Sequence, residues 1–217
     1  MDDCPNISLL LARAGAAIGR EPRARLLPTR VALLRPLLSR RNGFYAFDRS
    51  LHVFPIGSAC EPSEIDLESW NAGSLWRGGY GRELDDTIFF AEDLFGEQFG
   101  LDAGGRIVRF KPETGEIQPH SDNVDEWARR ILDGPEFETG FHFARQWTER
   151  NGPIASGRRL LPAMPFMLGG EFSLENLFDG DAAEGMRFRA DLALQARGVP
   201  DGASVRLVIP ERCGDGR

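Results

Sequence analysis

A run of short extended segments joined by tight turns, residues 86–118, limits what this chain can fold into more than any other feature. Its first segment, 87–90, is β-branched and aromatic, which suits a pleated surface. Apolar side chains alternate with polar or small ones over 97–101, the period of a strand with one buried face. The turn sequences Asp-Ala-Gly-Gly at 102–105 and Pro-Glu-Thr-Gly at 112–115 favour chain reversal. These residues predict an antiparallel β-meander inside a domain of the α+β class.

Length and charge narrow the class of protein further. The chain has 217 residues with 41% hydrophobic side chains, enough to bury a core without the support of disulfides or metal ions. The formal net charge is −7, whereas general nucleic-acid binding requires a basic face. We therefore expect no nucleic-acid partner. Arginines dominate up to residue 41 and acids dominate over 61–138, a distribution compatible with a basic protein partner.

The cysteines and the N-terminus indicate where the protein works. Cys4, Cys60 and Cys213 are widely spaced, which argues against a zinc site or a disulfide framework and favours a reducing compartment. The opening sequence MDDC is acidic where a secretory signal needs positive charge. No apolar run approaches the length of a membrane span. We therefore expect a cytoplasmic protein with no membrane partner.

Other segments predict helices and strands around the meander, giving a central antiparallel or mixed sheet with helices packed around it. Residues 123–132 show the clearest helix, with Asn123 as the cap and Glu126 as the matching capping-box acid. Apolar spacing predicts further helices at 6–18, 28–41, 66–76, 137–150 and 181–197, and strands at 44–47, 51–54, 160–170, 172–177 and 203–209. Pro36 weakens the second of these helices because it removes a backbone donor.

Side chains capable of chemistry are present but do not form a recognisable catalytic pattern. His52 in a strand, His120 in a loop and His142 in a helix have no second ligand at metal-binding spacing, so structural roles are expected. The four tryptophans lie in amphipathic segments and are expected in the core. We predict no catalytic residue, no metal ligand and no cofactor site.

Acidic residues near the meander are the remaining candidates. Neighbouring side chains on a strand point to opposite faces, so Glu92 and Asp93 are not expected to share one metal ion. A solvated or partner-facing acidic edge is the better interpretation. The predicted partner-binding residues are Asp85, Asp86, Glu92, Asp93 and Glu97.

Several segments, in order, resemble the SUKH superfamily of the Smi/Knr type. They include NGFYAFDRSLHVFP at 42–55, FFAEDLFGEQFGLD at 89–102, and the pair PFMLGGEFSLENL at 165–177 and EGMRFRADLALQ at 184–195. Leu27-Pro28, Trp70-Asn71, Leu75-Trp76, Pro112 to Glu116 and Trp127-Ala128 add to the likeness. The N-terminal helix departs from many members because it carries arginines where acids are common.

The resemblance implies one SUKH-like domain over 1–217, with an N-terminal helix and loop (1–26), a core (27–152), a C-terminal portion packed on it (153–210) and a tail (211–217). It also implies a bacterial immunity protein that binds and neutralises a cognate protein toxin, a class that includes nucleases. Two alternatives stay open: a scaffold or regulatory interaction protein of the same superfamily, and a metal-dependent nuclease or hydrolase.

Overall fold

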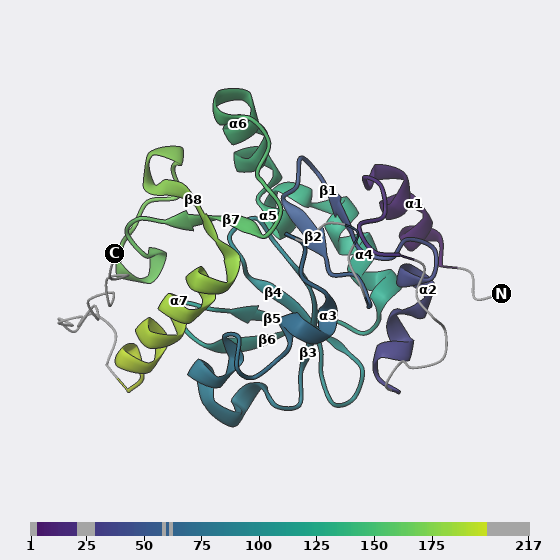
Figure 1. Ribbon diagram of the computed structural model, residues 1–217, viewed down its shortest axis with the longest axis horizontal. Coiled ribbons are helices and arrows are strands. Elements are labelled where there is room, and N and C mark those ends of the chain that lie inside the picture. The colour runs from purple at the N-terminus through teal and green to yellow at the C-terminus, as the bar shows by residue number, and fades with distance from the viewer. Residues whose placement is uncertain (1–3, 21–28, 58–59, 61–62, 199–217) are drawn as a thin grey trace.

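The architecture is α+β, as the sequence predicts. A computed structural model describes residues 4–20, 29–57, 60 and 63–198. Within them lie a six-stranded sheet, a separate two-stranded sheet and seven α-helices that surround the sheets (Figure 1). The expected strand at 203–209 and the expected tail at 211–217 fall outside the described residues.

The main sheet is a continuous antiparallel meander in which each strand pairs with the next along the chain. Its strands are β1 (Phe44–Ala46), β2 (Leu51–Val53), β3 (Ile88–Glu92), β4 (Gln98–Leu101), β5 (Ile107–Lys111) and β6 (Glu116–Ser121). The two predicted turns join β4 to β5 and β5 to β6. Gly105 and Gly115 take φ of 80° and 72° there, a conformation that suits glycine. The predicted meander is confirmed.

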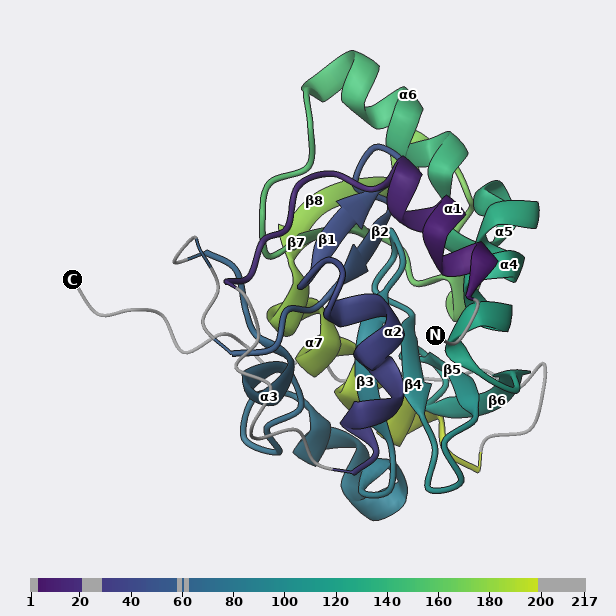
Figure 2. The same ribbon diagram turned by 90° about the vertical axis from the view of Figure 1, so that its right-hand side faces the viewer.

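Both faces of this sheet are covered, because aromatic side chains alternate across it. Phe90 and Phe99 face the helix α4 (Val124–Asp133), where the ring of Trp127 lies 5.1 and 5.8 Å from theirs. On the opposite face, Phe89 and Phe110 pack on Trp76, at 5.5 and 6.2 Å. Figure 2 shows α4 and α7 on opposite sides of the strands. Trp70, Trp76 and Trp127 are buried, as expected, whereas Trp147 is half-buried.

The capping prediction for α4 is also confirmed. The side chain of Asn123 accepts a hydrogen bond from the backbone N–H of Glu126 at 2.9 Å. Glu126 reaches back to the N–H of Asp122 at 3.0 Å, one residue before the cap. The helix packs beside α1 (Pro5–Arg13), and Asp125 accepts from the backbone N–H of Ile7.

Several predicted helices are shorter than expected. The first ends at Arg13, because Ala14 turns extended and bridges Ala46. The segment around Pro36 is a 3₁₀ helix η1 (Val31–Leu34) followed by a single turn α2 (Arg35–Leu38), as a proline inside a helix favours. The helix expected at 66–76 is α3 (Leu67–Trp70), followed by the 3₁₀ helix η2 (Arg77–Leu84). Asn71 ends α3 by bonding both strand β3 and the carbonyl of Leu67.

The C-terminal portion forms a unit beside the main sheet. The expected helix at 137–150 is divided at Gly140, with φ of 74°, into α5 (Pro135–Thr139) and α6 (Phe141–Asn151). Strand β7 (Arg158–Pro162) pairs with β8 (Leu177–Asp181) and not with the meander. Residues 172–177 were expected as a strand, but residues 172 and 173 are bends and η4 (Leu174–Asn176) follows them, so the strand begins only at Leu177. Helix α7 (Ala182–Ala196) closes the unit, capped by Asp181.

Candidate functional site

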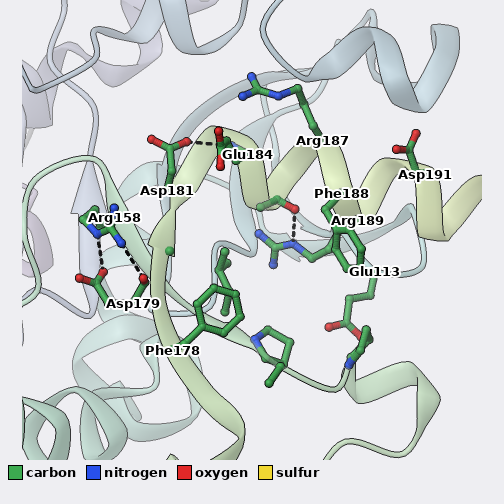
Figure 3. A pocket seen from close by; sticks show the side chains of 16 residues that line it. Glu113, Arg158, Phe178, Asp179, Asp181, Glu184, Arg187, Phe188, Arg189 and Asp191 are labelled. Carbon is green, nitrogen blue, oxygen red and sulfur yellow. Dashed lines mark hydrogen bonds and ion pairs between the residues drawn. The ribbon is translucent and has the colours of Figure 1, made fainter. Parts of the chain in front are cut away.

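A groove with a volume of about 880 Å³ lies between the small sheet and α7. Strand β8 forms one wall and α7 the other, and the turn between β5 and β6 reaches one end through Glu113 (Figure 3). Phe178 projects from β8 and Phe188 from α7, and both are exposed. Leu161 and Pro162 add apolar surface from β7. The groove is therefore apolar along its walls and open to solvent.

The charged residues around the groove are mostly acidic. Five carboxylates line it, against three guanidinium groups: Glu113, Asp179, Asp181, Glu184 and Asp191, against Arg158, Arg187 and Arg189. Each arginine contacts this chain's own acceptors. Arg158 pairs with Asp179 at 2.9 Å, Arg187 donates to the carbonyl of Leu75 at 3.1 Å, and the buried Arg189 donates to the carbonyl of Gly185 at 3.1 Å.

Large apolar side chains are exposed mainly on this C-terminal unit. Eight such residues are exposed in the described chain, and six of them lie between 137 and 194: Phe137, Met164, Phe172, Phe178, Phe188 and Leu194. Phe172 stacks on Phe166 with ring centroids 3.8 Å apart, so part of the surface is a preformed aromatic ridge. Grouped exposed apolar residues are typical of binding surfaces.

A second, smaller pocket of about 390 Å³ contains two of the predicted acidic residues. Arg109 on β5 lies at its base and pairs with three carboxylates: Asp93 at 2.9 Å, Glu97 at 2.6 Å and Glu138 at 3.1 Å. Glu138 also accepts from His120 at 3.0 Å. The guanidinium uses Nε, Nη1 and Nη2 in these contacts, so it is occupied by protein groups.

The pKa values in this cluster are shifted in opposite directions. Burial, and next the neighbouring Glu97 carboxylate, raise the pKa of Asp93 to about 7 against the opposing effect of Arg109. Burial also acts to raise the pKa of Glu138, but the hydrogen bond from His120 and the charge of Arg109 outweigh it and lower that pKa. A cleft with such shifts is a candidate for function, although a structural ion-pair network produces the same pattern.

Glu92 belongs to a different cluster, on the other side of the strand from Asp93. Its carboxylate lies 2.9 Å from Nε of Arg159 on β7, close but not aligned as a hydrogen bond, and 3.0 Å from Nδ1 of His52. Gln98 donates to it at 3.1 Å. Burial raises the pKa of Glu92, but the charge of Arg159 and the bonds from His52 and Gln98 more than offset this and lower it. Burial lowers the pKa of His52.

The predicted acidic residues therefore do not form one surface. Glu92 and Asp93 are 2% and 1% exposed, so the expectation of a solvent-facing edge is wrong for both. They are inside because Arg159 and Arg109, distant in sequence, supply their counter-charges. Glu97 is half-buried, whereas Asp85 and Asp86 are exposed at the end of η2. The expectation that Glu92 and Asp93 point away from each other is confirmed by their separate partners.

The three histidines occupy different settings. His52 lies on β2 as expected, stacked on Tyr45 with ring centroids 4.3 Å apart. His120, expected in a loop, is part of β6, and His142 is exposed on α6. Among the residues that the structure describes, no three or more His, Cys, Asp or Glu side chains converge as a metal site would require.

Sequence reasoning missed the groove. Its walls come from β8 and α7, and the sequence placed the final strand of this region at 172–177. The available signal was Phe188, which lies between Arg187 and Arg189 in the predicted helix. Helices in the described part of the chain are all too short or too polar to cross a bilayer.

Comparisons with known proteins bear on the fold alone. No protein-family model matches the sequence, and no curated protein matches it. Among solved structures, the chain is similar to the crystal structure of Atu4351 from Agrobacterium tumefaciens, with a TM-score of 0.55 and 13% sequence identity. The likeness covers 83% of this chain and 86% of that one. It shows that this arrangement of sheet and helices occurs in another protein.

Proposed function

We propose that this protein is a non-catalytic binding module of the SUKH type, an immunity protein that neutralises a cognate bacterial toxin by direct contact. The proposal takes its family from the segments quoted above, at 42–55, 89–102 and 165–195. It includes a cytoplasmic location, which the wide spacing of the cysteines favours.

The observation that carries the proposal is the concentration of exposed apolar side chains on the C-terminal unit. Monomeric proteins rarely expose grouped large apolar residues without a binding role, because each costs free energy in contact with water. Two of them, Phe178 and Phe188, line an open groove whose charged rim is mainly acidic. Aromatic anchors within a polar rim are the usual composition of a protein–protein interface.

Charge supports a basic partner. The net charge of −7 steers a positively charged surface towards this protein and raises the association rate. A toxin that cleaves nucleic acid needs a basic substrate cleft, so nucleases are the toxin class that suits this surface. The internal pairing of Asp93 and Glu97 with Arg109 favours binding over hydrolysis, because these carboxylates already have protein partners.

The test uses a large protein with a toxin-like C-terminal domain, sought among the products of the neighbouring genes. Its C-terminal domain is co-expressed with this protein, and the complex is measured by co-elution in size exclusion and by rescue of cell growth. We expect a one-to-one complex and full rescue. A toxin domain that neither co-elutes with this protein nor loses toxicity in its presence would refute the proposal. Metal-dependent hydrolysis by the purified protein, lost in Glu92→Ala, would favour the enzyme alternative instead.

A further inference from the structure

We propose that the groove between β8 and α7 is the docking site, and that it accepts a partner segment in which apolar side chains alternate with arginine or lysine. This inference rests on the proposed function and deepens it, because it names the surface and the chemistry that the surface selects.

The apolar part of the argument comes from the two walls. Phe178 on β8 and Phe188 on α7 project into the same space from opposite sides (Figure 3), and they are 48% and 42% exposed. Pro162 and Pro165 line the groove near Phe178 without adding charge. A side chain inserted between the two rings would remove apolar area from water on both sides, the arrangement of an interface anchor.

The electrostatic part comes from the rim. Glu184 and Asp191 on α7 are exposed, and so is Asp181, the last residue of β8, which caps the helix. Figure 3 shows Asp181 and Glu184 near the start of the helix and Asp191 with Glu113 at the other end, so carboxylates flank the phenylalanines at both ends. A cationic side chain on either side of an apolar anchor would therefore meet a carboxylate.

The arginines do not cancel this field for an incoming ligand. Arg189 is buried and donates to the carbonyl of Phe95 at 2.5 Å, so its guanidinium is turned into the protein. Arg158 is held by Asp179, with a further bond to the backbone oxygen of that residue at 2.6 Å. Arg187 is exposed and donates to the carbonyl of Leu75 at 3.1 Å, and in Figure 3 its guanidinium extends away from Phe178. The open rim therefore carries more carboxylates than available guanidinium groups.

The acidic charge also distinguishes among the molecules that could occupy the groove. A second copy of this chain would bring its own charge of −7 to an acidic groove, and nucleic acid would bring phosphates. A basic protein segment with apolar anchors satisfies both the walls and the rim.

The first experiment needs no toxin. A fluorescein-labelled peptide in which arginine alternates with leucine around one central tryptophan is titrated with the full-length protein, and binding is followed by anisotropy. A counterpart peptide carries glutamate in place of arginine. We expect the basic peptide to bind at least about tenfold more tightly than the acidic one. The double variant Phe178→Ser/Phe188→Ser should weaken binding of the basic peptide by about tenfold or more.

Matched controls separate the groove from the rest of the surface. Phe137→Ser is the control for the phenylalanine variants, because Phe137 is 81% exposed and lies outside the groove. Asp191→Arg reverses a charge in the groove, and its control is Glu149→Arg, which reverses an exposed acid on α6. We expect the groove variants to lose binding and the controls to keep it, with unchanged far-ultraviolet circular dichroism throughout. Equal affinity for both peptides, or equal binding by groove and control variants, would overturn the inference.

A second experiment repeats these variants with the toxin domain. If the toxin binds the wild type and every groove variant equally, the docking site is wrong and the proposed function stands. If the toxin does not bind at all while the basic peptide still requires Phe178 and Phe188, the proposed toxin partner is wrong and the groove remains a site for basic segments.

Discussion

Replacing Arg159 by methionine tests whether its guanidinium stabilises the fold by neutralising the buried carboxylate of Glu92. Arg159 is 1% exposed, and its removal leaves the carboxylate of Glu92 with only His52 and Gln98 as polar partners. Breaking a buried pair in this way costs about 3–5 kcal/mol of unfolding free energy, because an uncompensated charge stays in a region of low dielectric. For a chain of this size that corresponds to a melting temperature lower by roughly 6–20 °C, at about 2–4 °C per kcal/mol.

The assay is urea unfolding followed by circular dichroism at several pH values. Arg158→Met is the matched control, since the neighbouring arginine pairs with Asp179 at 39% and 33% side-chain exposure and is expected to contribute less than about 1 kcal/mol. The double variant Arg159→Met/Glu92→Gln removes the stranded charge and should recover at least about 1 kcal/mol relative to Arg159→Met.

The pH dependence has a definite sign. In the wild type the lowered pKa of Glu92 gives stability that is present above the ordinary value of 4.5 and is lost as the pH falls through the lowered value. In Arg159→Met burial dominates, so the pKa of Glu92 rises and the penalty grows with increasing pH. The difference between the two proteins should therefore shrink as the pH falls through the raised pKa of the variant towards the lowered pKa of the wild type. Equal losses for Arg159→Met and Arg158→Met, or a difference independent of pH, would refute the reasoning.

Three further outcomes are expected. Because the pKa of Asp93 is raised to about 7, its contribution to stability falls as the pH rises from about 4 to 7, and Asp93→Asn should remove that part of the slope in urea midpoints measured at pH 5 and pH 8. Gly140→Ala should lower the unfolding free energy by at least about 1–2 kcal/mol, since φ is 74° and the new Cβ would lie 2.8 Å from the ring of Phe95; an unchanged midpoint would contradict this. Trp70→Phe removes the donor that bonds Gln98 at 2.7 Å and should cost about 1–3 kcal/mol in thermal unfolding, whereas a neutral effect would mean that the amide finds another partner.

The sequence predicted those elements whose signals are local. The meander follows from turn residues at 102–105 and 112–115, and α4 follows from the cap at Asn123, because each signal acts within a few residues of the element it fixes. Helix ends at Arg13 and Trp70 were not predicted, since they depend on pairing with strands β1 and β3. Tertiary contacts override local propensity at such positions.

The candidate site was less accessible to sequence reasoning. Glu92 and Asp93 look like exposed acids in an acidic stretch, and only the return of Arg109 and Arg159 from distant segments makes them internal. The groove depends on where β8 begins, and a shift of about five residues in that strand moved Phe178 from an unassigned loop to the wall of a cavity. A small error in strand boundaries changes which side chains face a site.

The described chain has two hydrophobic clusters, and the smaller one, formed by Leu94, Ala144, Ile154, Leu160 and Leu177, lies under the C-terminal unit. The β7–β8 side of the groove packs on this smaller cluster through Leu160 and Leu177, whereas α7 packs on the larger cluster through Met186, Ala190 and Ala193. A substitution in the interior of the β7–β8 pair is therefore expected to disturb mainly the smaller cluster, whereas one on the buried face of α7 also disturbs the interior that supports the six strands.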